Sequence, residues 1–257
     1  MSRTGLAVGG VALIGLGAAI AFGWWWPSTA HATVQLDAPV RTVEVANDSG
    51  DVIIRAADVA RATVRQSFHY SWGEPEKAYT ASDGELVLHG CGSWCSVDYQ
   101  VTVPRGTAIH GSLNSGELIL TSVESVDVHV DSGDVSVSDV NGRVTVEADS
   151  GDVELRDVGG RVEVNADSGS VEGSGLSGPV RAQLSSGDLT LRLAEPADVR
   201  AAVNSGDITL TVPHVPYHVE GGTDSGDREI DVPRNSSSEH LLTLQTDSGD
   251  VTVHTPS

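Results

Sequence analysis

The carboxylates of one repeated tetrapeptide are the most conspicuous chemical groups in this sequence. Asp-Ser-Gly-Asp, or a close variant of it, recurs at Ser132, Ser150, Ser168 and Ser186, each time after eighteen residues. If the repeats stack as neighbouring coils, equivalent aspartates would form a column with a spacing of about 4.8 Å. Calcium prefers such oxygen ligands. The candidate metal ligands are therefore Asp134, Asp152, Asp188 and Asp207.

A solvated turn is the alternative explanation of the same motif. Glycine adopts a positive φ without steric penalty, and a preceding Asp or Asn can accept a backbone N–H in an Asx turn. Two carboxylates about 4.8 Å apart repel by only about 0.9 kcal/mol in water, so the turn needs no metal. The chain also lacks the nonapeptide and loop motifs of dedicated calcium sites. We expect no obligatory cofactor, with calcium as the alternative.

Aromatic side chains gather in one segment of the chain. Six of the seven aromatic residues that follow residue 26 lie between residues 68 and 99. Four of them could form a stacking platform for sugar rings or for a partner protein. These binding candidates are Tyr70, Trp72, Tyr79 and Trp94. The alternative is that the rings cover the open end of a stack of repeats.

The two cysteines, Cys91 and Cys95, are four residues apart. A straight strand would hold their Cα atoms about 13 Å apart, which is too far for a disulfide. A turn at Gly92 and Ser93 would close that gap. We expect a local disulfide formed in an oxidising compartment, because two thiols alone make a poor zinc site.

The signatures of common enzymes are missing from the sequence. Gly-x-Ser-x-Gly, His-Glu-x-x-His and the phosphate-binding Gly-x-x-x-x-Gly-Lys do not occur. Paired carboxylates, as in enzymes that act on polysaccharides, remain a distant alternative, because nothing singles out one pair among many acidic residues. We predict no catalytic residues and no enzymatic activity.

Each repeat contains two apolar runs and two turns. Val135, Val153, Val171 and Leu189 form one column at a spacing of eighteen residues, and Val144, Val162 and Val180 form a second. Within each run apolar and polar residues alternate, which indicates a strand with one buried face. The sequence therefore predicts an all-β fold: a parallel β-solenoid of coils of about eighteen residues over 111–254, preceded by an irregular β region over 37–110 that contains the aromatic and cysteine loop.

The N-terminal segment predicts export. Gly5 to Trp26 is an uncharged apolar stretch of 22 residues that follows Arg3 and ends in three tryptophans. Its length and flanks favour a single transmembrane helix over residues 1–26, a linker over 27–36, and a C-terminal domain outside the cytoplasm. The alternative is a secretory signal cleaved near Ala32.

Net charge restricts the partners. The chain has 36 acidic and 15 basic residues, a formal net charge of −21. Such a surface repels nucleic acid and anionic lipid headgroups, so we expect no nucleic-acid partner. Contact with the membrane would be through the N-terminal helix.

The recurring Ser-Gly-Asp-Val corners from 114 to 251, together with the strand and turn at 97–106, resemble the bacterial putative adhesin family of unknown function. The resemblance covers about Val43 to Val253. It implies a β-solenoid exposed on the cell envelope and brings no catalytic residues and no proven ligand. We expect a non-enzymatic surface protein that contacts a cell-wall polymer, a carbohydrate or a surface protein. The alternative is an envelope-stress, cation or carbohydrate sensing module.

Overall fold

The computed structural model describes residues 28–71 and 77–256, and every helix or strand assigned in those residues is a β-strand. The expected transmembrane or signal segment, 1–26, lies outside the described residues. Within the described ranges there is no helix long and apolar enough to cross a membrane.

The strands form two sheets, sheet A with twelve strands and sheet B with eleven. From the N-terminal end of the rod, sheet A contains β1 (Ser28–Gln35), β4 (Thr63–Tyr70), β7 (Cys95–Pro104), β3 (Val52–Ala57), β9 (Leu118–Thr121), β11 (Val135–Val140), β13 (Val153–Val158), β15 (Val171–Leu176), β17 (Leu189–Leu193), β19 (Ile208–Thr211), β23 (Val251–His254) and β21 (Arg228–Asp231). In the same direction, sheet B contains β5 (Tyr79–Ser82), β6 (Glu85–His89), β2 (Thr42–Asn47), β8 (Ala108–Ser115), β10 (Val126–Ser132), β12 (Val144–Ser150), β14 (Val162–Ser168), β16 (Val180–Ser186), β18 (Val199–Ser205), β22 (Leu241–Ser248) and β20 (His218–Ser225).

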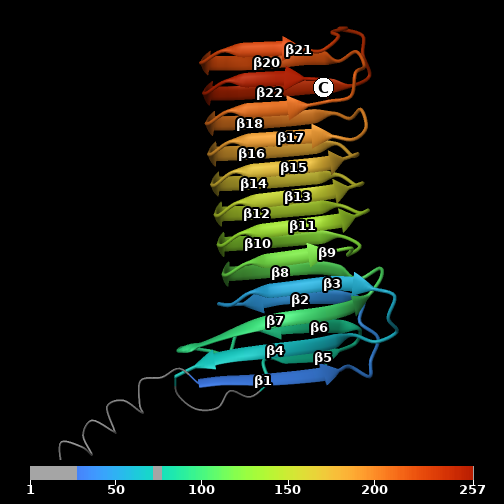
Figure 1. Cartoon of the computed structure of the whole chain (residues 1–257), viewed down its shortest axis with the longest axis vertical. Coiled ribbons are helices and arrows are strands. Elements are labelled where there is room, and N and C mark those ends of the chain that lie inside the picture. Colours follow the sequence, from blue (N-terminus) through green and yellow to red (C-terminus); the bar gives the residue numbers. More distant parts are fainter. Residues whose placement is uncertain (1–27, 72–76, 257) are drawn as a thin grey trace, which may run out of the picture.

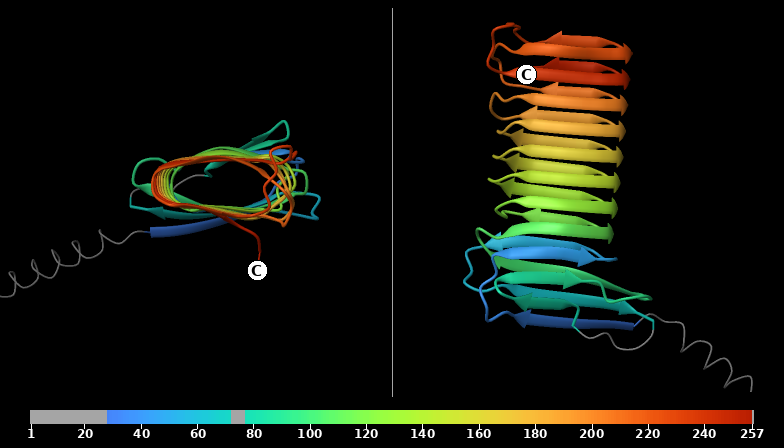
Figure 2. Two further views of the ribbon diagram at one scale, coloured as in Figure 1. Left: turned by 90° about the horizontal axis from the view of Figure 1, so that it is seen from above. Right: turned by 180° about the vertical axis from the view of Figure 1, so that it is seen from behind.

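The two sheets face each other and extend into a rod (Figure 1). Viewed along the rod, the coils superpose as one flattened oval (Figure 2). Almost all neighbouring strands are parallel; the antiparallel pairs are β1 with β4, β4 with β7, and β5 with β6. The prediction of an all-β, mostly parallel solenoid is therefore confirmed.

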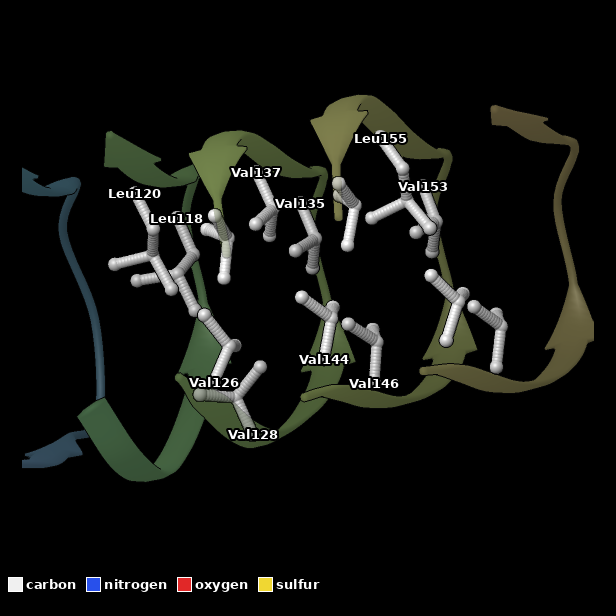
Figure 3. Close-up of a cluster of buried hydrophobic side chains, with 14 of the residues drawn as sticks. Leu118, Leu120, Val126, Val128, Val135, Val137, Val144, Val146, Val153 and Leu155 are labelled. Atoms are coloured by element: carbon white, nitrogen blue, oxygen red, sulfur yellow. The ribbon is translucent and has the colours of Figure 1, made fainter. Parts of the chain in front are cut away.

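The apolar columns pair in the predicted register. Val135 pairs with Val153, Val153 with Val171, and Val144 with Val162. Side chains such as Val137 and Leu155 on sheet A point toward the valines of sheet B across the core (Figure 3). Burying a valine or leucine stabilises a fold by about 1.5–3 kcal/mol. The regular succession of these residues explains why so thin a rod needs few aromatic side chains.

Glycine is required at the Ser-Gly-Asp corner by backbone packing as well as by φ. Gly151 has a φ of +135°, and a Cβ built there would lie 2.0 Å from the carbonyl oxygen of Gly133. Gly169 lies over Gly151 in the same way, with a Cβ distance of 2.0 Å. The coils therefore stack through direct contact of their corner backbones, and the strict glycine of the repeat follows from that contact.

Chain order and spatial order differ at both ends of the rod. The coil β2–β3 lies between β6–β7 and β8–β9, and the last coil, β22–β23, lies between β18–β19 and β20–β21. The corners therefore do not stack in sequence order beyond Ser205, which pairs with Ser248 and not with Ser225. Every corner carries the same motif, so the motif cannot specify which corner is the neighbour. The long connection 232–240 gives the chain the length to return past β20–β21.

Two expected boundaries differ from the structure. Residues 27–36 were expected as a linker, but 28–35 form β1, in which Val34 pairs with Val64 of β4. An unpaired edge of β4 would expose a row of backbone N–H and C=O groups, and β1 satisfies them. The boundary expected between 110 and 111 falls inside β8, and one apolar core continues through both regions.

Candidate functional site

The corner aspartates lie on one edge of the rod, as the sequence predicts, and they are joined by hydrogen bonds. Asp134 Oδ1 accepts the backbone N–H of Asp152 at 2.9 Å, and Asp152 Oδ1 accepts that of Ser170 at 2.8 Å. Asp188 Oδ1 accepts the N–H of Asp207 at 3.0 Å. We call this edge the aspartate ladder. It gives each of these carboxylates a structural role in joining one coil to the next.

The aspartate ladder continues to the end of the rod and has a gap at Ser170. Asp207 accepts from Asp250, and Asp250 accepts from Asp227, each at 2.8 Å. At Ser170 the side chain is too short, and within the described residues no side chain accepts the N–H of Asp188. A shallow groove of about 350 Å³ lies beside the gap and is lined by five acidic residues: Glu117, Asp134, Asp152, Glu154 and Glu172.

Two clusters of histidine and carboxylate side chains occur on sheet B. His129 Nε2 lies 2.8 Å from Asp131 Oδ1, and its Nδ1 lies 3.7 Å from Glu147 Oε2. His129, Asp131 and Asp149 bring ligand atoms close enough to hold a metal ion together, as do Glu44, Glu85 and His110. Sequence reasoning missed both clusters, although Glu147 follows His129 by the repeat length of eighteen residues.

The expected aromatic platform is only partly present. The side chain of Trp94 is 80% exposed, whereas Tyr79 is 8% exposed and belongs to the core. Tyr70 is half-buried against that core, and Trp72 lies outside the described residues. Tyr79 is therefore wrong as a member of a sugar-stacking platform, because β5 turns its ring inward, where it helps to cover the apolar interior.

Tyr99 is the main polar anchor of this end of the rod, and sequence reasoning did not single it out. Its hydroxyl lies 2.5 Å from the carbonyl oxygen of Ala78 and 2.7 Å from that of His89. It also accepts a hydrogen bond from Gln66 Nε2 at 3.3 Å. Burial raises the pKa of Tyr99 well above its usual value. The hydroxyl thus connects β4, β7 and the β5–β6 hairpin.

The predicted disulfide is confirmed. Cys91 and Cys95 are joined, with their Cα atoms 5.6 Å apart. Gly92 and Trp94 both have a positive φ, +92° and +69°, and these form the tight turn that brings the cysteines together. The loop presents the Trp94 indole to solvent.

A basic groove on the outer face of sheet B was also missed. Arg161, Arg181 and Arg200 line a hollow of about 180 Å³, with Pro179 and Leu241 among its apolar walls. The three arginines belong to successive coils and are twenty and nineteen residues apart in the sequence. In the folded chain the repeat brings them together.

Comparison with known proteins agrees with this architecture. The family model described as Toastrack DUF4097 matches residues 78–254. A crystal structure of a putative adhesin from Bacteroides fragilis NCTC 9343 is similar, with a TM-score of 0.54 and 14% sequence identity, over 89% of this chain and 99% of that one. A putative adhesin from Parabacteroides merdae ATCC 43184 aligns with a TM-score of 0.42 and 9% identity, over 90% and 97% of the two chains. No curated protein matches significantly in sequence.

Proposed function

Because the chain belongs to the Toastrack DUF4097 family, we propose that it is a non-enzymatic protein of the cell envelope that binds other surface molecules along its rod. The observation that carries this proposal is the continuous stack of coils, which exposes two long, flat sheet faces (Figure 2). Solenoids characteristically use such extended surfaces for binding. The surface is acidic, and its partners are wall polymers, carbohydrates or surface proteins.

The location of the rod outside the cytoplasm is part of the same proposal. The disulfide between Cys91 and Cys95 supports it, since disulfides persist in oxidising compartments and are rare in the cytosol. The apolar segment from Gly5 to Trp26 supplies either a single membrane anchor or a signal that is removed near Ala32. The anchored form would hold the rod at the outer side of the membrane.

A role in sensing cations is the second candidate. The clusters around His129 and His110 favour it, because imidazole and carboxylate groups together suit transition metals. This candidate predicts that metal addition stabilises the rod, whereas the binding role alone does not.

The proposed function is tested on the exported domain. Cells are fractionated, the full chain is cross-linked in place, and the material that co-purifies is identified. Recovery of the protein with the envelope together with a wall polymer or surface protein supports the proposal. Recovery from the cytoplasm, or from the envelope without any partner, overturns it.

A Trp94→Ala variant then tests whether the partner contacts the disulfide loop or the sheet faces. Val59→Ala, another exposed apolar residue, is the matched control. Loss of partner only in Trp94→Ala assigns the contact to the loop. Unchanged binding by both variants assigns it to the sheets.

A further inference from the structure

The outer face of sheet B carries arginines that lack acidic partners. Arg181 and Arg200 are register partners on the neighbouring strands β16 and β18. The backbones of these two positively charged residues are therefore about 4.8 Å apart. Arg161 lines the same groove from the preceding coil. Among the described residues no carboxylate lies within ion-pair distance of these three side chains, although the chain has a net charge of −21.

Of the arginines in the described residues, only Arg61, Arg105 and Arg156 form ion pairs, so what distinguishes the basic groove is that three unpaired arginines line one hollow. Arg61 pairs with Asp37 at 3.1 Å, and Arg105 pairs with Asp58 at 2.7 Å. In the basic groove, Asp198 is the acidic neighbour, and its Oδ1 accepts the backbone N–H of Leu241 at 2.9 Å.

Glu163 is the register partner of Arg181, and it too forms no ion pair in the part of the chain described. The guanidinium groups of Arg161, Arg181 and Arg200 therefore keep their hydrogen-bond donors available.

A second hollow lies on β14, β16 and β18, next to the basic groove. It has a volume of about 350 Å³ and its polar lining consists of Asn165, Asp167, Gln183, Ser185 and Asn204, with the small side chain of Ala202 leaving space. Outward-facing positions along a strand are two residues apart. Along β16, Gln183 therefore lies about 7 Å from Arg181, and Ser185 lies about 13 Å from Arg181. We call this surface the amide hollow. Its side chains offer both donors and acceptors.

We propose that the basic groove and the amide hollow together bind an acidic glycan, a polysaccharide whose sugars carry carboxylate or phosphate groups. Guanidinium groups bind both anions through paired N–H donors. The amides and hydroxyls of the amide hollow match sugar hydroxyls. The proposal rests on the proposed function and names the ligand class of one of the two sheet faces.

The remaining surface selects among anionic partners. The basic groove is a local positive patch on an acidic rod, so a long, uniformly charged nucleic acid or a flat anionic membrane would meet repulsion on either side of it. A glycan chain presents its charged groups one sugar at a time and can place one of them at the basic groove.

The experiment measures binding of the full chain to oligogalacturonate, to a phosphorylated maltooligosaccharide and to its unphosphorylated parent. We expect binding of at least one acidic glycan, no binding of the neutral parent, and a marked loss of affinity at high salt, because salt screens exposed charges. The two acidic probes distinguish carboxylate from phosphate as the preferred group.

The variant Arg181→Gln with Arg200→Gln removes two positive charges from the basic groove. We expect its dissociation constant to rise at least about tenfold, the size expected for losing charge-assisted hydrogen bonds. The matched control is Arg156→Gln with Arg192→Gln, which changes the net charge equally on sheet A. An unchanged melting temperature shows that each variant remains folded.

Two results overturn the proposal: no binding of either acidic probe by the native chain, or equal loss of affinity in both double variants. If the native chain binds no acidic glycan but still co-purifies with envelope material, the glycan site fails while the proposed function stands. If it also co-purifies with nothing, both fail.

Discussion

At the scale of single residues, the corner glycines are the most sensitive positions of the rod. The Gly151→Ala variant places a methyl group 2.0 Å from the carbonyl oxygen of Gly133, at a φ of +135°. We expect the free energy of unfolding to fall by about 3 kcal/mol or more, since backbone strain and overlap add. Urea denaturation measures the change.

Gly92→Ala is the control for that variant. Gly92 also has a positive φ, +92°, but no atom lies within 4 Å of a Cβ built there. It should lose only about 1–2 kcal/mol, the contribution of backbone strain alone. Equal losses in the two variants would contradict the role of close coil contact.

The gap in the aspartate ladder predicts a stabilising change. Ser170→Asn supplies a side-chain oxygen at the position from which Asp152 reaches the next coil, and that oxygen can accept the free N–H of Asp188. We expect a gain of about 0.5–1.5 kcal/mol, measured by thermal unfolding. Asn adds no charge to the acidic groove beside it. Ser170→Ala is the control and should show no gain; an equal gain in both would dismiss the hydrogen bond as the cause.

The corner motif was predictable from the sequence. That its aspartates accept backbone N–H groups was also predictable, but the residues that donate to them were not. Spacing alone indicated a turn at Gly133 and Gly151 and a column of aspartates beside them. Asx turns within one corner were expected, whereas Asp134 Oδ1 accepts from Asp152, a residue in the next coil. Local turn rules describe partners two or three residues away, so they could not identify a partner eighteen residues on.

At the scale of elements, the irregular N-terminal strands depend on one hydroxyl. The Tyr99→Phe variant removes the contacts that join β7 to Gln66 and to the carbonyl groups of Ala78 and His89. We expect a loss of about 1–3 kcal/mol, because Gln66 and the carbonyl group of His89 would lose this partner, whereas the carbonyl group of Ala78 keeps the backbone N–H of His89. Tyr70→Phe, in a half-buried ring, should change stability little.

Alkaline pH provides an independent check on Tyr99. Its pKa is raised by burial, so the folded chain keeps the proton under conditions in which the unfolded chain releases it. The associated stability is fully present below about pH 10 and is lost as pH rises toward the folded pKa. Stability should therefore decline less steeply with alkaline pH in Tyr99→Phe than in the native chain. Parallel curves would contradict the assignment.

The strands themselves were largely predictable, and the aromatic cluster was less so. Strict alternation over residues such as Val135 to Val137 and Val144 to Val146 leaves one possible buried face. Tyr79 and Trp94 both sit near loops in the sequence, and composition does not say which ring faces inward. Whether such a ring covers the core or meets solvent depends on how β5 and the disulfide loop pack against it.

At the scale of the whole molecule, the reversed order of the last two coils has a measurable effect. Deleting 239–257 removes β22–β23, which among the described strands is the only coil that pairs with β20–β21. The inward side chains Val219 and Ile230 are only half-buried even in the complete rod. We expect β20–β21 to lose protection from amide hydrogen exchange throughout.

Deletion of 213–257 is the control, because it removes both coils and exposes the same surface of β18–β19. The rest of the rod should have the same protection in the two truncated chains. Retained protection of β20–β21 after deletion of 239–257 would mean that this coil docks directly on β18–β19.

Coil order at the ends could not be predicted from the repeat, because any corner can stack on any other. The corners at Ser225 and Ser248 have the same sequence, Asp-Ser-Gly-Asp, and yet Ser205 pairs with Ser248. The basic groove was missed for a related reason. Arg181 and Arg200 occupy equivalent positions, but Arg161 lies two residues earlier in its repeat, and only the three-dimensional stack shows that the three share one hollow.

The antiparallel strands at the N-terminal end also bear on self-association. A stack of identical parallel coils exposes edges to which another molecule could add indefinitely, as in an amyloid fibril. At this end β5 runs antiparallel to its neighbour β6 in sheet B. In sheet A, β4 is antiparallel to β7 and β1 is antiparallel to β4, so β1 runs in the same direction as the parallel strands of that sheet. A second rod that arrives end-on and continues sheet A in parallel would have to pair antiparallel with β5 in sheet B, so identical rods cannot extend both sheets in the parallel mode that joins the coils.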